Sequence, residues 1–162
     1  MKTERRTLFM AEAAAAHARV IQSHGGTVVF TNGVFDLLHP GHIRYLQEAR
    51  ALGDVLILGV NSDRSVTRIK GPQRPITPEH ERAEVLMALA SVDAVVLFDE
   101  DTPDRIIRTI QPDVLVKGAD WSVDEIVGRD VVEARGGRVV RIALTEGFST
   151  TELIRRIQSG SS

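Results

Sequence analysis

The sequence predicts a single doubly wound α/β domain. Its 162 residues are about the length of one domain. Short runs rich in valine, isoleucine and leucine alternate with segments of helical periodicity, and these runs are apolar at successive positions, as in parallel strands covered on both faces. No internal repeat or linker marks a second domain. We therefore expect one Rossmann-like domain with five parallel strands and helices on both faces.

Five strands and six helices are expected along the chain. The strands are residues 27–31, 55–60, 94–98, 114–117 and 139–143. The helices are residues 5–23, 42–51, 78–90, 103–110, 124–135 and 150–158. Residues 1–26 are expected to form a leading helix packed on the domain, residues 27–158 the domain itself, and residues 159–162 a frayed tail.

Three helix starts have a local signal. Thr77 and Thr102 each precede a proline, which is typical of an N-cap followed by the first helical residue. Ser149 and Glu152 have the spacing of a capping box, in which the glutamate side chain reaches back to the cap.

Composition excludes several classes of protein. The formal net charge of −2 gives no reason to expect a nucleic acid or an anionic membrane as partner. The absence of cysteine excludes a disulfide framework and thiolate metal sites, and it fits a reducing compartment. No apolar stretch approaches the ~20 residues that span a bilayer. We expect a cytoplasmic protein that acts on small molecules.

Polar segments follow four of the expected strands, at residues 31–42, 61–74, 117–121 and 145–151. In an open parallel sheet, ligands bind beyond the carboxyl ends of the strands. The second of these segments, extended to residue 75, carries four positive charges and is expected to be a loop that faces the same crevice. A solvated basic loop is the alternative.

The first of these segments joins a strand to a helix and contains His39 and His42. The free backbone N–H groups and positive dipole end of such a helix bind anions. Two imidazoles at this position suggest phosphate chemistry, whereas a surface turn or an adventitious metal pair is the alternative.

The same segment resembles the G-x-F-D-x-x-H-x-G-H signature of the cytidylyltransferase-like nucleotidyltransferases. The named positions are filled by Gly33, Phe35, Asp36, His39, Gly41 and His42. The resemblance implies transfer of a nucleotidyl group from a nucleoside triphosphate to a phosphate acceptor, with release of pyrophosphate. It also implies Mg²⁺ carried with the nucleotide, no dedicated metal site, and a homodimer.

The resemblance assigns roles to individual residues. His39, His42 and Lys70 are expected to be catalytic, and the lysine would also contact the acceptor phosphate. The nucleotide-binding residues would be Thr31, Asn32, Gly33, Phe35, His39, Gly41, His42, Lys117, Gly118, Asp120, Ser149, Thr150 and Thr151. The acceptor would contact Asp36, Asp63, Lys70, Arg74 and Arg82, with Asp36 orienting a cation. A surface helical ion pair is the alternative for Arg82.

A finer resemblance, over residues 28–157, is to the heptose 1-phosphate adenylyltransferases, which correspond to the C-terminal half of bifunctional ADP-heptose synthesis enzymes. It rests chiefly on the segments 30–33, 58–63, 70–76, 98–103, 116–121 and 147–151. It implies ATP and D-glycero-D-manno-heptose 1-phosphate as substrates, and a product for lipopolysaccharide core or surface-glycan synthesis.

The chain departs from the two patterns at four positions. In the heptose branch, Ala119 replaces the commoner glycine and Trp121 a tyrosine. In the wider family's second signature, I-S-T-T at a helix start, Phe148 replaces the isoleucine, and upstream of it Leu144 replaces an arginine found in many relatives. Three alternatives stay open: a cytidylyltransferase for glycerol 3-phosphate or a related small phosphate, a guanylyltransferase that makes GDP-heptose, and a nucleotide-binding module without turnover.

Overall fold

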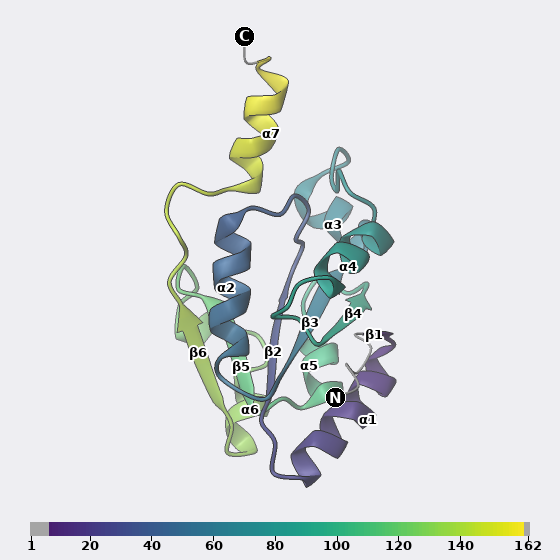
Figure 1. Ribbon diagram of the computed structural model, residues 1–162, viewed down its shortest axis with the longest axis vertical. Helices are drawn as coiled ribbons and strands as arrows, with labels where there is room; N and C mark the ends of the chain where they lie inside the picture. The colour runs from purple at the N-terminus through teal and green to yellow at the C-terminus, as the bar shows by residue number, and fades with distance from the viewer. Residues whose placement is uncertain (1–6, 161–162) are drawn as a thin grey trace.

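A six-stranded parallel sheet forms the centre of the protein, in a computed structural model that describes residues 7–160 (Figure 1). The strand order is β1-β4-β3-β2-β5-β6. The strands are β1 (Thr7–Phe9), β2 (Val28–Gly33), β3 (Val55–Asn61), β4 (Ala94–Phe98), β5 (Val114–Gly118) and β6 (Arg138–Ile142). The single α/β domain with a parallel sheet is thus confirmed, and the number of strands is corrected from five to six.

Helices cover both faces of the sheet. The helices are α1 (Ala11–Ser23), α2 (Pro40–Arg50), α3 (Asp63–Lys70), α4 (Glu79–Met87), α5 (Asp104–Ile110), the 3-10 helix η1 (Val123–Glu125), α6 (Arg129–Ala134) and α7 (Thr150–Gln158). One core cluster joins Phe30 and Ile57 to α1, α5 and α6, and the other joins Val29 and Leu58 to α2 and α4. Successive strand residues therefore serve opposite cores, which explains why the strands are apolar at every position.

The sixth strand is β1, which lies inside the segment expected to be the leading helix. Its three residues pair in parallel with Ala94, Val95 and Val96 of β4, and helix α1 begins only at Ala11. Pairing with the open edge of β4 therefore overrides the local helical pattern. Because β4 is remote in the sequence, the residues around β1 do not indicate this pairing. Residues 1–6 of the expected helix and residues 161–162 of the expected tail lie outside the described residues.

Two further helical predictions were wrong. The expected basic loop contains α3, because Ser62 caps its start by accepting from the N–H of Ser65 at 3.1 Å and Val66 is buried beneath it. The expected helix 124–135 is divided into η1 and α6 by Gly128, whose φ of +87° is strained for any other residue.

The expected caps are formed only in part. Helices α4 and α5 begin after Pro78 and Pro103, without a side-chain cap from the preceding threonines. Ser149 does accept from the N–H of Glu152, at 3.4 Å. The Glu152 carboxylate pairs with Arg155 instead of reaching back to the cap.

Aspartates close the amino ends of the central strands. Asp54 accepts from the N–H of Thr27 at 2.7 Å, Asp93 from that of Leu56 at 2.8 Å, and Asp113 from that of Val28 at 2.8 Å. Each carboxylate therefore satisfies a backbone donor in or next to a strand, at the edge of the sheet opposite to the functional segments.

Helix α7 projects beyond the carboxyl edge of the sheet (Figure 1). None of its residues is buried, although Leu153, Ile154 and Ile157 give it an apolar side. Across the described residues, no helix is long and apolar enough to cross a membrane.

Candidate active site

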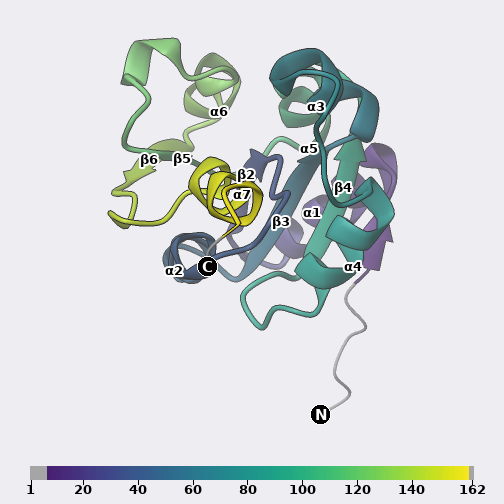
Figure 2. The same ribbon diagram turned by 90° about the horizontal axis from the view of Figure 1, so that it is seen from above.

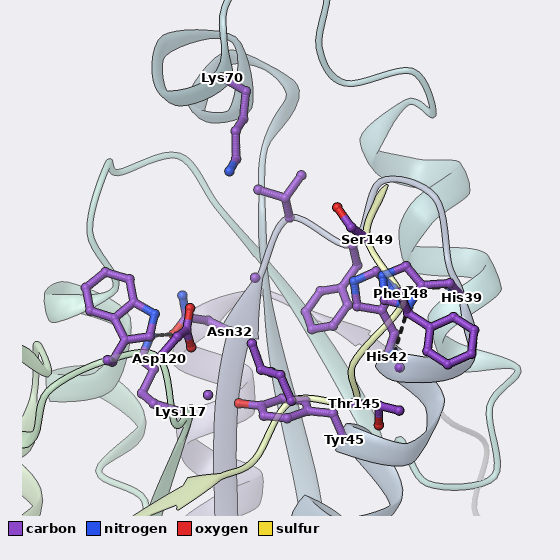
Figure 3. A pocket seen from close by; sticks show the side chains of 17 residues that line it. Asn32, His39, His42, Tyr45, Lys70, Lys117, Asp120, Thr145, Phe148 and Ser149 are labelled. Atoms are coloured by element: carbon purple, nitrogen blue, oxygen red, sulfur yellow. Dashed lines mark hydrogen bonds between the residues drawn. The ribbon is translucent and has the colours of Figure 1, made fainter. Parts of the chain in front are cut away.

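The strand order reverses at β2, which lies between β3 and β5. A cavity of about 610 Å³ opens at the carboxyl ends of these strands. Residues predicted for the site line it: Asn32, Gly33, Phe35, His39, Gly41, His42, Lys70, Lys117, Gly118, Asp120 and Ser149. In Figure 3 the histidines and Ser149 lie on one side, Lys117 and Asp120 on the other, and Lys70 above.

The two histidines are fixed by reciprocal bonds at the start of α2. The Nδ1 atom of His39 accepts from the backbone N–H of His42, and the Nδ1 atom of His42 accepts from that of His39, each at 3.3 Å. The rings stack with centroids 3.8 Å apart. Because both Nδ1 atoms act as acceptors, each neutral imidazole carries its proton on Nε2.

Burial keeps both imidazoles uncharged. It lowers the pKa of His42 to about 4, helped by the neighbouring His39, and it also lowers the pKa of His39. The pair therefore offers two Nε2–H donors at neutral pH. With Nδ1 occupied and Nε2 protonated, neither ring has a free lone pair for a transition metal, which argues against the metal alternative.

Gly41 is required for close packing at this turn. A Cβ atom at this position would lie 2.9 Å from the His39 ring and 3.2 Å from Cβ of Phe148. A side chain would therefore displace the imidazole from its place at the cavity wall.

Lys117 bridges the two halves of the sheet. Its ammonium donates to Oδ1 of Asn32 at 2.5 Å and lies 5.7 Å from the centre of the Trp121 ring. Burial lowers the pKa of Lys117 to about 8, although the Asp120 carboxylate acts in the opposite direction. Because the buried ammonium is poorly hydrated, an anionic ligand nearby would stabilise its charged form.

Lys70 reaches the cavity from the last turn of α3 and is exposed. The helix is anchored by Arg68, which bonds to Asp101 at 2.7 Å and to the backbone carbonyl of Asp99. Beyond it, Thr67 donates to the carbonyl of Arg74 at 2.8 Å. A flexible cation is thus presented by a fixed element.

Four residues expected to contact the acceptor lie outside the cavity wall: Asp36, Asp63, Arg74 and Arg82. Arg82 has a fully buried side chain that donates to the carbonyls of Thr77, Val34 and Asn61 and to Asp63.

The Asp36 carboxylate accepts from the N–H groups of Ile76 and Thr77 and pairs with Arg74 at 2.6 Å. Burial raises its pKa, but these donors outweigh that effect and hold the pKa below its usual value. The pair of Arg82 with Asp63 and the pair of Asp36 with Arg74 form bonds within the chain. We therefore propose none of these four residues as a contact of the substrate.

Three predicted nucleotide contacts also lie off the wall. Thr31 is buried and bonds to Tyr45 and to the Val116 carbonyl, while Thr150 donates to the Leu37 carbonyl at 3.0 Å. Thr151 is exposed on α7.

Six further residues of the wall had no individual role in the predicted site: Val34, Tyr45, Trp121, Leu144, Thr145 and Phe148. Four of them, Val34, Trp121, Thr145 and Phe148, lie in the polar segments expected to face the ligand. Helical spacing could have found Tyr45, which lies one turn after His42 on α2. Leu144 lies just before the expected segment 145–151 and reaches the cavity through the path of the chain after β6.

Known proteins share this fold and these segments. The family described as "Cytidylyltransferase-like" matches residues 30–156. "Bifunctional protein HldE" of Gluconobacter oxydans is 57% identical over 148 residues, covering 90% of this chain and 31% of the relative. The protein of the same name from Geotalea uraniireducens is 53% identical over 150 residues, covering 93% and 31%. The chain thus spans less than a third of these curated relatives.

A solved structure agrees with the sequence match. The "lipopolysaccharide core biosynthesis protein" of Thermoplasma volcanium superposes with a TM-score of 0.64 at 34% identity, covering 75% of this chain and all of the other. The family match spans most of the domain, including the histidine turn and the residues that begin α7. The chain belongs to the cytidylyltransferase-like family.

Proposed function

We propose that the protein transfers the adenylyl group of ATP to D-glycero-D-manno-heptose 1-phosphate, forming ADP-heptose and pyrophosphate. The pair of Nε2–H donors at the start of α2 is the observation that carries the proposed chemistry. The donors lie at the N-terminus of α2 and across the cavity from Lys117. Such a fixed array stabilises negative charge that grows on a phosphate during transfer.

The reaction is a single displacement at the α-phosphorus. An oxygen of the acceptor phosphate forms a bond to the α-phosphorus, and the bond from that phosphorus to the bridging oxygen of the β-phosphate breaks. The electron pair leaves with pyrophosphate. His39 and His42 would donate to the α- and β-phosphate oxygens, and Lys70 would hold the two anions together against their repulsion.

Mg²⁺ would enter with the triphosphate. Among the described residues no group of three histidine, aspartate or glutamate side chains is gathered to hold a metal, and Asp120 is the carboxylate in the cavity wall. This donor set fits an ion that takes its ligands from phosphates and water. The bound ion would offset charge on the triphosphate.

The choice of acceptor is supported by the relatives. The solved structure with 34% identity is described as a lipopolysaccharide core biosynthesis protein. The sequence segments that resemble the heptose branch include the residues around Lys117 and Trp121 in the cavity wall. We propose that the product serves lipopolysaccharide core or other surface-glycan synthesis, in the cytoplasm where ATP and sugar phosphates are found.

A pyrophosphate-release assay with four nucleotides and several sugar phosphates tests this proposal. We expect turnover only with a nucleoside triphosphate, Mg²⁺ and heptose 1-phosphate together, and the highest rate with ATP. Turnover of CTP with glycerol 3-phosphate, or of GTP with heptose phosphate, would replace the substrate assignment. Nucleotide binding without pyrophosphate release under any combination would favour the non-catalytic module.

We also propose a homodimer. None of the residues of α7 is buried in the described part of the chain, and Ile157 on its apolar side is 72% exposed. Light scattering should give twice the chain mass, and Ile157→Glu should reduce it to one. A wild-type protein that stays monomeric at high concentration would contradict this.

A further inference from the structure

We propose that Phe148 is a positioning residue for the imidazole of His39, a role that builds on the proposed adenylyl transfer. The rings of Phe148 and His39 stack with centroids 5.9 Å apart and planes 18° apart. His39 stacks in turn on His42, at 3.8 Å and 18°. Two ring contacts therefore link Phe148, His39 and His42, which Figure 3 shows grouped on one side of the cavity.

The hydrogen bonds alone hold His39 weakly. Its Nδ1 atom accepts from the His42 N–H at 3.3 Å, which is beyond the usual length for such a bond. His39 is only partly buried, so its ring needs other contacts to keep its orientation. Neighbouring rings on His42 and Phe148 limit rotation of the imidazole and keep Nε2–H directed as the reciprocal bonds require.

Phe148 is itself held by α2. The Arg44 guanidinium lies 5.5 Å from the centre of the Phe148 ring, a cation–π contact. Gly41 leaves the space that the Phe148 side chain approaches, since a Cβ there would lie 3.2 Å from the Phe148 Cβ.

An aromatic ring at this position does what an aliphatic side chain cannot. Leucine would fill similar space, but it offers neither a flat face to His39 nor a quadrupole to Arg44. The residues that follow Phe148 do not compensate, because α7 buries none of its side chains and Thr150 provides one further bond, to the Leu37 carbonyl. The orientation of His39 therefore depends on this ring.

The test compares Phe148→Leu with Phe148→Tyr. We expect Phe148→Leu to lower kcat about tenfold, the change that loss of an aromatic pair produces, with little change in the KM for ATP. Phe148→Tyr should retain the wild-type kcat. In nitrogen-15 NMR spectra of the imidazoles, the His39 signals should move toward averaged tautomer values in the leucine variant and not in the tyrosine variant.

Phe9→Leu is the matched control, because it removes a phenylalanine–histidine stack remote from the cavity, that of Phe9 on His17 at 5.5 Å. It should change neither kcat nor the His39 signals. If Phe148→Leu raises the KM for ATP while kcat and the His39 signals stay unchanged, Phe148 is a nucleotide contact and the inference is wrong. If even the wild type shows no turnover, the proposed function fails, and the NMR signals still decide the inference.

Discussion

Burial acts on His39, His42 and Lys117 in one direction, towards their neutral forms. It lowers the pKa values of His42 and Lys117 to about 4 and about 8, and it lowers that of His39. At neutral pH the free protein therefore presents a neutral imidazole on His42 and an ammonium on Lys117 that is charged at the cost of burial. A triphosphate supplies the compensating charge, so binding and protonation of the site are coupled.

The His42 imidazole should impose no pH dependence on kcat/KM for ATP near neutral pH. Its pKa in the free protein is lowered to about 4, and protonation there would place a proton on Nδ1 and break its bond from the His39 N–H. Because kcat/KM reports the free enzyme, it should show no loss from His42 until the pH approaches this lowered pKa. A decline in kcat/KM centred at about pH 6.5 or above would show a histidine whose pKa is not lowered and contradict this account.

Lys117 should make ATP binding take up a proton. Above pH 8 its ammonium is mostly deprotonated in the free protein, and a bound triphosphate raises the pKa again. ATP affinity should therefore fall as the pH rises above 8, and calorimetry at pH 8.5 in buffers of different ionisation enthalpy should detect uptake of up to about one proton. Lys117→Met should abolish the uptake. Equal uptake in that variant would assign the proton elsewhere.

At the scale of elements, α3 and the chain that follows it form a support for Lys70. Arg68 ties the helix to the segment after β4, and Asp36 ties residues 74–77 to the turn after β2. Arg68 and Asp36 thus make structural bonds, whereas Lys70 reaches the cavity.

Asp36→Ala and Lys70→Ala should separate the structural role of Asp36 from the role of Lys70 in the reaction. Removing Asp36 leaves Arg74 and two backbone N–H groups without their acceptor, which should cost about 3 kcal/mol of unfolding free energy. Removing Lys70 should leave the unfolding midpoint unchanged while kcat falls and the KM for the sugar phosphate rises. Urea unfolding and steady-state kinetics on both variants measure this. A stable Asp36→Ala protein with a raised KM would return Asp36 to the acceptor site.

The sequence predicts features formed by contiguous residues, and it misses those formed by contacts between remote segments. The histidine turn is one contiguous segment, and the structure places it in the cavity wall. The acceptors of Arg82 are carbonyls of Val34, Asn61 and Thr77, which come from three separate segments, so an interior role could not be read from its surroundings in the sequence. Strand β1 was missed for the same reason, since its state depends on β4.

At the scale of the whole molecule, the sheet is joined less extensively on one side of β2 than on the other. β2 pairs with β3 over six positions but with β5 only at Val29 and Phe30. Beyond that point side chains bridge the strands, with Thr31 bonded to the Val116 carbonyl and Lys117 to Asn32. The cavity opens where the pairing stops.

Rates of hydrogen exchange should therefore differ between the two sides of the boundary between β2 and β5. We expect the amides of β5 and β6 to exchange faster than those of β3 and β4, because fewer ladder bonds connect them to the centre. ATP should slow exchange in β5 and β6, since the ligand would contact both sides. Mass spectrometry with and without MgATP measures both effects. Uniform exchange across the sheet would contradict the division.

The row of Asp54, Asp93 and Asp113 has a consequence for altering this protein in the laboratory. These carboxylates secure the strands at the end of the sheet remote from the cavity. Trp121 and Leu144 in the cavity wall are about half exposed, so replacing them removes little packed volume. Libraries randomised at such positions should retain folded members in large numbers, which makes the chain a tolerant starting point for evolving new acceptor preferences.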